Sequence, residues 1–189
     1  MTETPPVRST RIALRSIVRE DYDYLHALAS DPAASYRWRY RGGTPSPEAF
    51  AAQLWDGVLA QFMVLSRESG RPVGAVALYN ANLHSGYVYL SLIADPRIRR
   101  TGISMDAGLL LCNYAFANWN LRRVYLETTE FNLEQFGSGE GRYFHEAARL
   151  RDHEFFSDRY WDLVTLVVER DDFADYGPRL LAALGATCD

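Results

Sequence analysis

The sequence predicts one α+β domain with a layered structure. Its 189 residues and its hydrophobic content of 48% suit a single domain with its own core. The expected elements follow one another as strand, two helices, three strands, helix, strand, short helix and two strands. This mixed order fits one layered α+β structure better than a doubly wound sheet, in which strands and helices alternate.

The first half of the chain is expected to form one strand, two helices and three further strands. The ranges are 11–18 for the first strand, 20–31 and 46–57 for the helices, and 61–67, 72–79 and 86–94 for the later strands. Glu20 and Asp21 stand where a helix dipole favours acidic residues. Ser46 and Pro47 are residue types that begin a helix. Gly70 lies in a short polar turn, which indicates a hairpin.

The second half is expected to contain a long helix, a strand and a closing hairpin. The helix begins at Ser104, the strand covers 122–129, and the hairpin strands cover 150–156 and 160–168. On the helix, a stripe at spacings of four and three predicts the buried face: Met105, Leu109, Cys112 and Phe116. Cys112 on this stripe should be buried and unreactive. We expect the domain to be 10–173, preceded by a flexible N-terminus at 1–9 and followed by a helical tail at 174–189.

The composition argues against several classes of protein. A net charge of −4 does not suit a general nucleic-acid binder, which carries a basic face. Cys112 and Cys188 form no CxxC pair, so a reducing cytoplasm is expected, with neither disulfides nor a zinc site. The four histidines have no metal-ligand spacing, so no metal is expected. A run of about 18 apolar residues does not occur, which argues against a membrane span.

The most informative segment is the loop between the strand at 86–94 and the long helix. It carries Arg97, Arg99, Arg100 and Gly102. Unpaired backbone N–H groups and the helix dipole make a helix N-terminus suitable for anions. Glycine lets the backbone turn tightly, and arginines can add charge-assisted contacts. A pyrophosphate would suit this loop, although the residues alone fit a solvated basic connector equally well.

Residues 99–104, Arg-Arg-Thr-Gly-Ile-Ser, resemble the pyrophosphate motif R/Q-x-x-G-x-G/A of the GNAT superfamily of N-acetyltransferases, with Ser104 in the last small-residue position. The resemblance extends over nearly the whole chain. Residues 121–127 are similar to the family's L-x-R-V-x-L-E strand, and Asn132 stands where the family has an asparagine. Residues 150–162 resemble its closing hairpin. The set looks most similar to the ribosomal-protein-acetyltransferase-like branch. It implies that family's α+β fold, in which helices flank a central, mixed but mostly antiparallel sheet.

The resemblance implies an acyl-CoA-dependent N-acyltransferase that moves an acetyl group from acetyl-CoA to a primary amine by direct attack. The donor would lie between the strands at 90–94 and 124–129. Backbone groups of Leu92 and Ile93 would pair with the pantetheine amides, and Asn132 would contact the same arm. The pyrophosphate would be held by Arg99, Arg100, Thr101, Gly102, Ile103 and Ser104. The acceptor would be a small-molecule or peptide amine, and a homodimer is compatible with the family.

The residues that usually handle protons in this family are changed. Gln135 and Gly139 stand where the family often has a serine and a general-acid tyrosine, and Tyr89 replaces a glutamate. Tyr89 and Ser138 are the nearest side chains that could donate a proton, so both are candidate catalytic residues. Water could do this work instead. Alternatively, the chain could be a GNAT-fold protein that binds acyl-CoA, or regulates, with little turnover.

Two further segments allow alternative interpretations. Residues 36–41 interleave arginine with tyrosine and tryptophan, so they either recognise an acceptor or simply pack their rings and expose their charges. Residues 137–141 superficially resemble the glycine-rich loop of S-adenosylmethionine-dependent methyltransferases. That loop follows the first strand of a long α/β domain, whereas 52 residues (189 minus 137) remain after Gly137.

Overall fold

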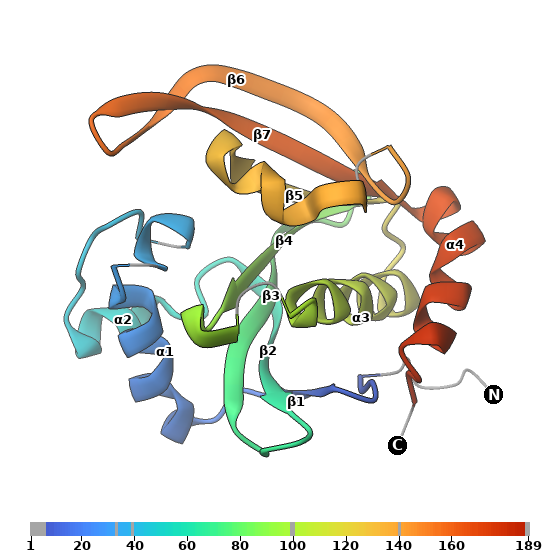
Figure 1. Ribbon diagram of the computed structural model, residues 1–189, viewed down its shortest axis with the longest axis horizontal. Helices are drawn as coiled ribbons and strands as arrows, with labels where there is room; N and C mark the ends of the chain where they lie inside the picture. Colours follow the sequence, from blue (N-terminus) through green and yellow to red (C-terminus); the bar gives the residue numbers. More distant parts are fainter. Residues whose placement is uncertain (1–6, 33, 39, 99–100, 140, 188–189) are drawn as a thin grey trace.

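The computed structural model describes residues 7–32, 34–38, 40–98, 101–139 and 141–187, without the side chains at 37 and 134–138. These residues form a seven-stranded sheet with helices on both faces, which confirms the expected α+β fold (Figure 1). The strands are β1 (Ile12–Ser16), β2 (Val58–Ser66), β3 (Pro72–Asn82), β4 (Tyr87–Ala94), β5 (Arg123–Thr129), β6 (His145–Phe156) and β7 (Arg159–Glu169). The α-helices are α1 (Tyr22–Ser30), α2 (Pro47–Gln53), α3 (Ile103–Asn118) and α4 (Arg170–Ala183).

The strand order is β1-β2-β3-β4-β5-β7-β6, and neighbouring strands are antiparallel except for β4 and β5. The parallel pair follows from the connection between these two strands. After β4 the chain passes through α3 before it enters β5, and a parallel pair needs a crossover of this length. β6 and β7 form a long hairpin at one edge of the sheet (Figure 1).

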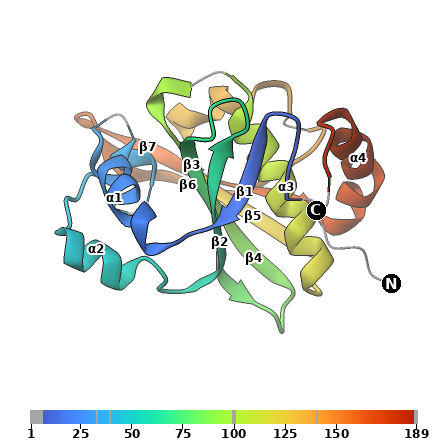
Figure 2. The ribbon, with the colours of Figure 1, turned by 90° about the horizontal axis from the view of Figure 1, so that it is seen from below.

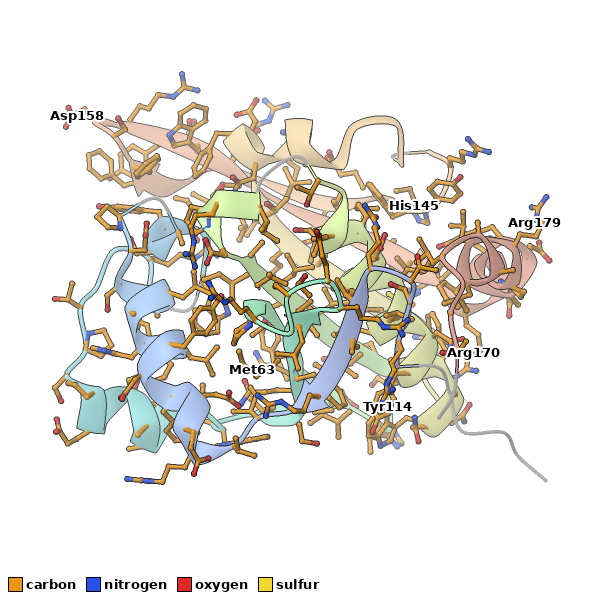
Figure 3. All side chains as sticks on the ribbon, turned by 60° about the horizontal axis from the view of Figure 1, so that its bottom comes forward. Met63, Tyr114, His145, Asp158, Arg170 and Arg179 are labelled. Carbon is orange, nitrogen blue, oxygen red and sulfur yellow. The ribbon has the colours of Figure 1, made fainter. Side chains whose placement is uncertain are left out.

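Two hydrophobic clusters cover the two faces of the sheet. On one face, Leu111 of α3 and Val88 of β4 belong to the first cluster, together with part of α4. On the other face, Leu25 of α1 and Met63 of β2 belong to the second cluster, together with α2. Met63 and Tyr114 of α3 accordingly belong to different clusters, and they lie apart in Figure 3. The two pairs of helices are well separated in Figure 2.

The buried face of α3 differs from the stripe expected from the sequence. Cys112 and Phe116 are buried as expected, but Met105 is 42% exposed. The buried face runs instead through Ala107 and Leu111, which are spaced by four residues. Met105 precedes Ala107 by two residues, which places it about 200° around the helix. The expectation for Met105 is therefore wrong.

The helix ends follow the local sequence. The Ser46 hydroxyl accepts a hydrogen bond from the Ala49 N–H at 3.2 Å and caps α2. The glycine-containing stretch Glu130–Gly139 forms a 3-10 helix, in keeping with the weak α-helix propensity of glycine. Within the described ranges, no helix combines the length and the hydropathy needed to span a membrane.

Candidate active site

β4 and β5 pair over three residues and then diverge. The ladder joins Tyr87, Val88 and Tyr89 to Arg123, Val124 and Tyr125. β4 continues to Ala94 and β5 to Thr129, each held along its outer side by β3 or β7. In the described sheet, the inward-facing N–H and C=O groups beyond the last pair have no strand partner. We call this opening, between 90–94 of β4 and 126–129 of β5, the wedge.

The end of β4 is packed against the start of α3. Both elements line one recess of about 10 Å³, room for a single water. The lining includes Leu92, Ile93, Ile103 and Ser104, which are four of the predicted donor-binding residues. Gly74 of β3 is also part of it, and a Cβ at Gly74 would lie 2.3 Å from the carbonyl oxygen of Ile93. The missing side chain at Gly74 therefore lets β3 and β4 approach closely beside this recess.

The start of α3 has the geometry expected for an anion cradle. Gly102 is the residue before the helix and has φ 78° and ψ −2°, a left-handed conformation that favours glycine. The positive end of the dipole of this 16-residue helix lies here, while the N–H groups of Ile103 and Met105 donate to the Thr101 hydroxyl at 3.4 Å and to the Gly102 carbonyl at 3.1 Å. The Thr101 hydroxyl donates to the carbonyl of Ile98 at 2.7 Å and tightens the loop. Arg99 and Arg100 lie outside the described residues, so their contacts stay predictions.

Arg97 is engaged by its own loop. Its guanidinium lies 2.5 Å from a carboxylate oxygen of Asp95, and the Arg97 N–H donates to the same carboxylate at 2.9 Å. The hydrogen bond from the guanidinium is the main cause that lowers the pKa of Asp95. A phosphate that approached Arg97 would therefore compete with Asp95 for its N–H groups.

Arg11, the residue before β1, binds the loop and the first turn at the start of α3. Its guanidinium donates to both carboxylate oxygens of Asp106, at 2.9 Å and 2.6 Å, and to the carbonyl of Thr101 at 2.7 Å. The Asp106 side chain is only 4% exposed. Arg11 and Asp106 are 95 positions apart, and the sequence analysis missed both because no local pattern links them.

Asn132 follows β5 at the end of the wedge, as the resemblance implied for a donor-contacting asparagine. It is 6% exposed, and its amide N–H donates to the Thr129 hydroxyl at 3.1 Å. Its amide oxygen is buried and accepts no hydrogen bond from the described residues. A buried acceptor of this kind suits a donated amide N–H, which pantetheine contains. The Ser138 side chain lies outside the described residues, so its catalytic role stays a prediction.

Tyr89 is the last β4 residue that pairs with β5, so it stands at the apex of the wedge. Its ring centroid lies 5.5 Å from that of Tyr125 and 6.1 Å from that of Tyr87. Burial raises the pKa of Tyr89, and the negative charge of Glu127 raises it further. The hydroxyl is therefore protonated at neutral pH and able to donate a proton. The sequence analysis did not single out Glu127, although its spacing of two from Tyr125 on a strand was a usable signal.

In the aromatic and basic loop at 36–41, the side chains that the structure describes pack against other parts of the chain, while the side chains of Arg37 and Arg39 lie outside the described residues. The Tyr36 ring lies 4.2 Å from that of Phe156 on β6, and Trp38 is buried in the cluster beneath α1 and α2. Arg41 forms an ion pair with Glu154 at 3.7 Å. These contacts favour the packing interpretation and connect the loop to the tip of the β6–β7 hairpin. Among the described residues, no cluster of histidine, cysteine or acidic side chains could hold a metal ion.

Comparison with known proteins gives the class of the chain. A family model described as "Acetyltransferase (GNAT) domain" matches residues 11–136. The chain therefore belongs to the GNAT acetyltransferase family. It is an acyl-CoA-dependent N-acetyltransferase, which acetylates an amine, and this confirms the activity that the sequence motifs implied. No curated protein sequence matches the chain.

Solved structures with the same fold include spermidine N-acetyltransferases from Vibrio cholerae. The form in complex with CoA and spermine has a TM-score of 0.75 and 19% identity, covering 86% of this chain and 98% of that one. A chimera of the V. cholerae enzyme and hSSAT has a TM-score of 0.73 and 19% identity, covering 88% of this chain and 99% of that one. At these identities the similarity establishes the fold alone.

Proposed function

We propose that acetyl-CoA lies in the wedge with its pyrophosphate on the N-terminus of α3, and that its acetyl group passes directly to a primary amine. The observation that carries this proposal is the open inner edge of β4, which leads from the apex at Tyr89 to the cradle at Gly102. From Tyr89 to Ala94 the strand spans roughly 16 Å, a length comparable to extended pantetheine.

Each part of the donor has residues in this chain that suit it. Backbone groups of Leu92 and Ile93 would pair with the pantetheine amides, and the buried amide oxygen of Asn132 would accept another N–H. Backbone N–H groups from Arg100 to Ser104 would bind the pyrophosphate, with Arg99 beside them. The thioester supplies an activated acetyl carbon, and the wedge orients it for attack.

Tyr89 is the proposed proton donor for the departing thiolate, since its raised pKa keeps the hydroxyl protonated. Ser138 is the second candidate for this role. The amine gains the acetyl carbon, the carbon–sulfur bond breaks, and the nitrogen releases a proton while sulfur takes one up. Replacing Tyr89 by Phe should therefore lower kcat more than it changes the affinity for acetyl-CoA.

The finer assignments are proposals of the same kind. The sequence motifs support the ribosomal-protein-acetyltransferase-like branch, while the similar structures bear the name of spermidine acetyltransferases. A small-molecule or peptide amine is therefore the proposed acceptor. We further propose that the protein forms a homodimer in the cytoplasm and acts without nucleic acid, membrane or metal.

The test is calorimetric titration with acetyl-CoA, with S-adenosylmethionine as the comparison ligand. Gly102→Ala should weaken acetyl-CoA binding about tenfold, because the left-handed conformation costs a side chain about 1–2 kcal/mol and the loop must shift. A Cβ at Gly102 would also lie 3.3 Å from the Arg11 guanidinium. Gly108→Ala is the control, because a Cβ on this α3 residue would meet nothing within 4 Å.

Release of free CoA with a panel of amines then tests turnover. If acetyl-CoA binds the Gly102→Ala variant as well as the wild type, the cradle is not the pyrophosphate site. If acetyl-CoA binds but none of the amines releases CoA, the amines tested are not its acceptors.

A further inference from the structure

Four tyrosines form a continuous group on the sheet face that is turned away from α3. Tyr79, Tyr89 and Tyr125 stand side by side across β3, β4 and β5, because the strand registers pair Tyr89 with both of the others. Tyr87 joins them from β4. Neighbouring ring centroids are 5.5–6.1 Å apart, so every ring contacts at least one other. All four side chains are half-buried, which leaves part of each ring accessible.

Glu127 adds a negative charge to this group. It lies two residues beyond Tyr125 on β5, so its side chain leaves the same face of the strand. Glu127 is exposed, and no ion pair joins it to a described cation. Arg123, on the same face of β5, donates to the Tyr125 hydroxyl at 3.5 Å, but its charge is paired with that of Glu169 at 2.8 Å. The group therefore presents aromatic rings together with one carboxylate that lacks an opposing charge.

The position of this group is as informative as its chemistry. The pair Tyr89 and Tyr125 is the last rung before β4 and β5 diverge, so the tyrosines lie beside the apex of the wedge, on one face of the sheet. A donor bound as proposed, with its pyrophosphate at Gly102, would have its thioester at this apex. On the same face, the cluster of α1 and α2 covers the sheet further along β4, at Ile93, and does not include the four tyrosines.

We propose that Tyr79, Tyr87, Tyr89, Tyr125 and Glu127 form the acceptor subsite, and that it takes a positively charged aliphatic amine. This inference rests on the proposed position of the donor. Aromatic faces attract ammonium groups, and the effect grows when the cation loses part of its water. The Glu127 carboxylate supplies the charge that selects a cation over a neutral or zwitterionic acceptor.

Three amines of equal chain length test the subsite: hexamethylenediamine, hexylamine and aminocaproate. Each is titrated calorimetrically into the wild-type protein, with and without saturating CoA. We expect the diamine to bind most tightly and aminocaproate most weakly. Glu127→Gln should weaken hexylamine binding about tenfold and change aminocaproate binding much less, because the charge of Glu127 acts on the net charge of the ligand. Glu68→Gln, in the exposed turn between β2 and β3, is the control for loss of a carboxylate.

Two variants of Tyr79 distinguish the contribution of its ring to amine binding from that of its hydroxyl. Tyr79→Leu should weaken diamine binding about fivefold, whereas Tyr79→Phe should retain most of it, because the ring provides the cation–π attraction. Circular dichroism and the melting temperature establish that each variant is folded. The KM of CoA-releasing amines should rise in parallel with these dissociation constants.

The possible outcomes distinguish this inference from the proposed function. If CoA does not bind, the proposed donor site is refuted. The amine titrations without CoA would still show whether the subsite binds positively charged amines. If the wild type binds the three amines equally, the subsite does not recognise charge. Equal effects of Glu127→Gln on hexylamine and aminocaproate would also overturn the assignment.

Discussion

Replacing Arg11 by Ala should weaken both the fold and the binding of acetyl-CoA. The change leaves the Asp106 carboxylate, 4% exposed, without two charge-assisted hydrogen bonds, and leaves the Thr101 carbonyl without a donor. Breaking a fully buried ion pair from one side costs about 3–5 kcal/mol. The Arg11 side chain is 45% exposed, so water replaces part of the lost interaction and we expect about 2 kcal/mol.

For a chain of this length, 2 kcal/mol corresponds to a fall in melting temperature of about 4–8 °C. The affinity for acetyl-CoA should fall roughly tenfold, because Asp106 lies in the first turn of α3 and its uncompensated charge would repel a pyrophosphate at the proposed site. Differential scanning fluorimetry measures the first effect and calorimetric titration the second. Asp106→Asn introduced together with Arg11→Ala should restore part of the affinity, since it removes that charge.

The chain contains a matched control for this experiment. Arg15 donates to both carboxylate oxygens of Asp21, at 3.0 Å and 2.8 Å, and to the carbonyl of Ser16 at 2.7 Å. Its exposure of 39% is close to that of Arg11, but it joins β1 to the start of α1 and not to the cradle. Arg15→Ala should therefore cost similar stability and leave acetyl-CoA affinity unchanged. If both variants lose affinity equally, Arg11 has no specific role in positioning the cradle.

Three further predictions concern the rest of the molecule. Tyr24→Phe should change the free energy of unfolding by less than about 0.5 kcal/mol, because the buried hydroxyl has no described partner. Tyr176→Phe should cost about 1 kcal/mol, because its hydroxyl donates to a backbone carbonyl. Urea unfolding of the two variants measures both values. In a Cys188→Ser background, Cys112 should react with a thiol reagent only on unfolding, because burial raises its pKa to about 12. Asp95→Asn should be destabilising at pH 7 and progressively less so in acid. In the folded protein the pKa of Asp95 is lowered from its ordinary value of 3.8. The ionised carboxylate therefore stabilises the fold above that ordinary value, and this contribution is lost as the pH falls through the pKa of the folded state.

The fold and the turn at Gly102 were predictable because their signals are local. The strand expected at 86–94 is observed at Tyr87–Ala94, since its alternating apolar residues and the following Asp95-Pro96 are contiguous. The turn was predictable for the same reason, because Gly102 and the start of α3 are adjacent in sequence. The binding of pyrophosphate there stays a prediction. The direction in which a side chain faces is less local. Met105 was misplaced because the helix stripe could be drawn along more than one line of apolar residues.

The parts that could not be predicted depend on contacts between distant segments. Arg11 reaches Asp106 only because α3 packs near β1 in the folded protein, and neither residue belongs to a recognisable motif. The tyrosine group depends on register: Tyr79 and Tyr125 adjoin Tyr89 because of the pairings of β3, β4 and β5. A shift of one residue in either pairing would place these rings on opposite faces.

The wedge stays open because β4 and β5 are each held on their outer sides by another strand. β4 is bonded to β3 along its outer edge, and its two faces are packed in different cores, through Leu90 on one side and Ile93 on the other. β5 is bonded to β7 from Arg123 to Thr129, and that pairing continues into the β6–β7 hairpin. For the inner edges to close on each other, one of these outer ladders or cores would have to break. The open edge of β4 is therefore a property of the folded chain, and a donor can bind to it without first disrupting a strand pair.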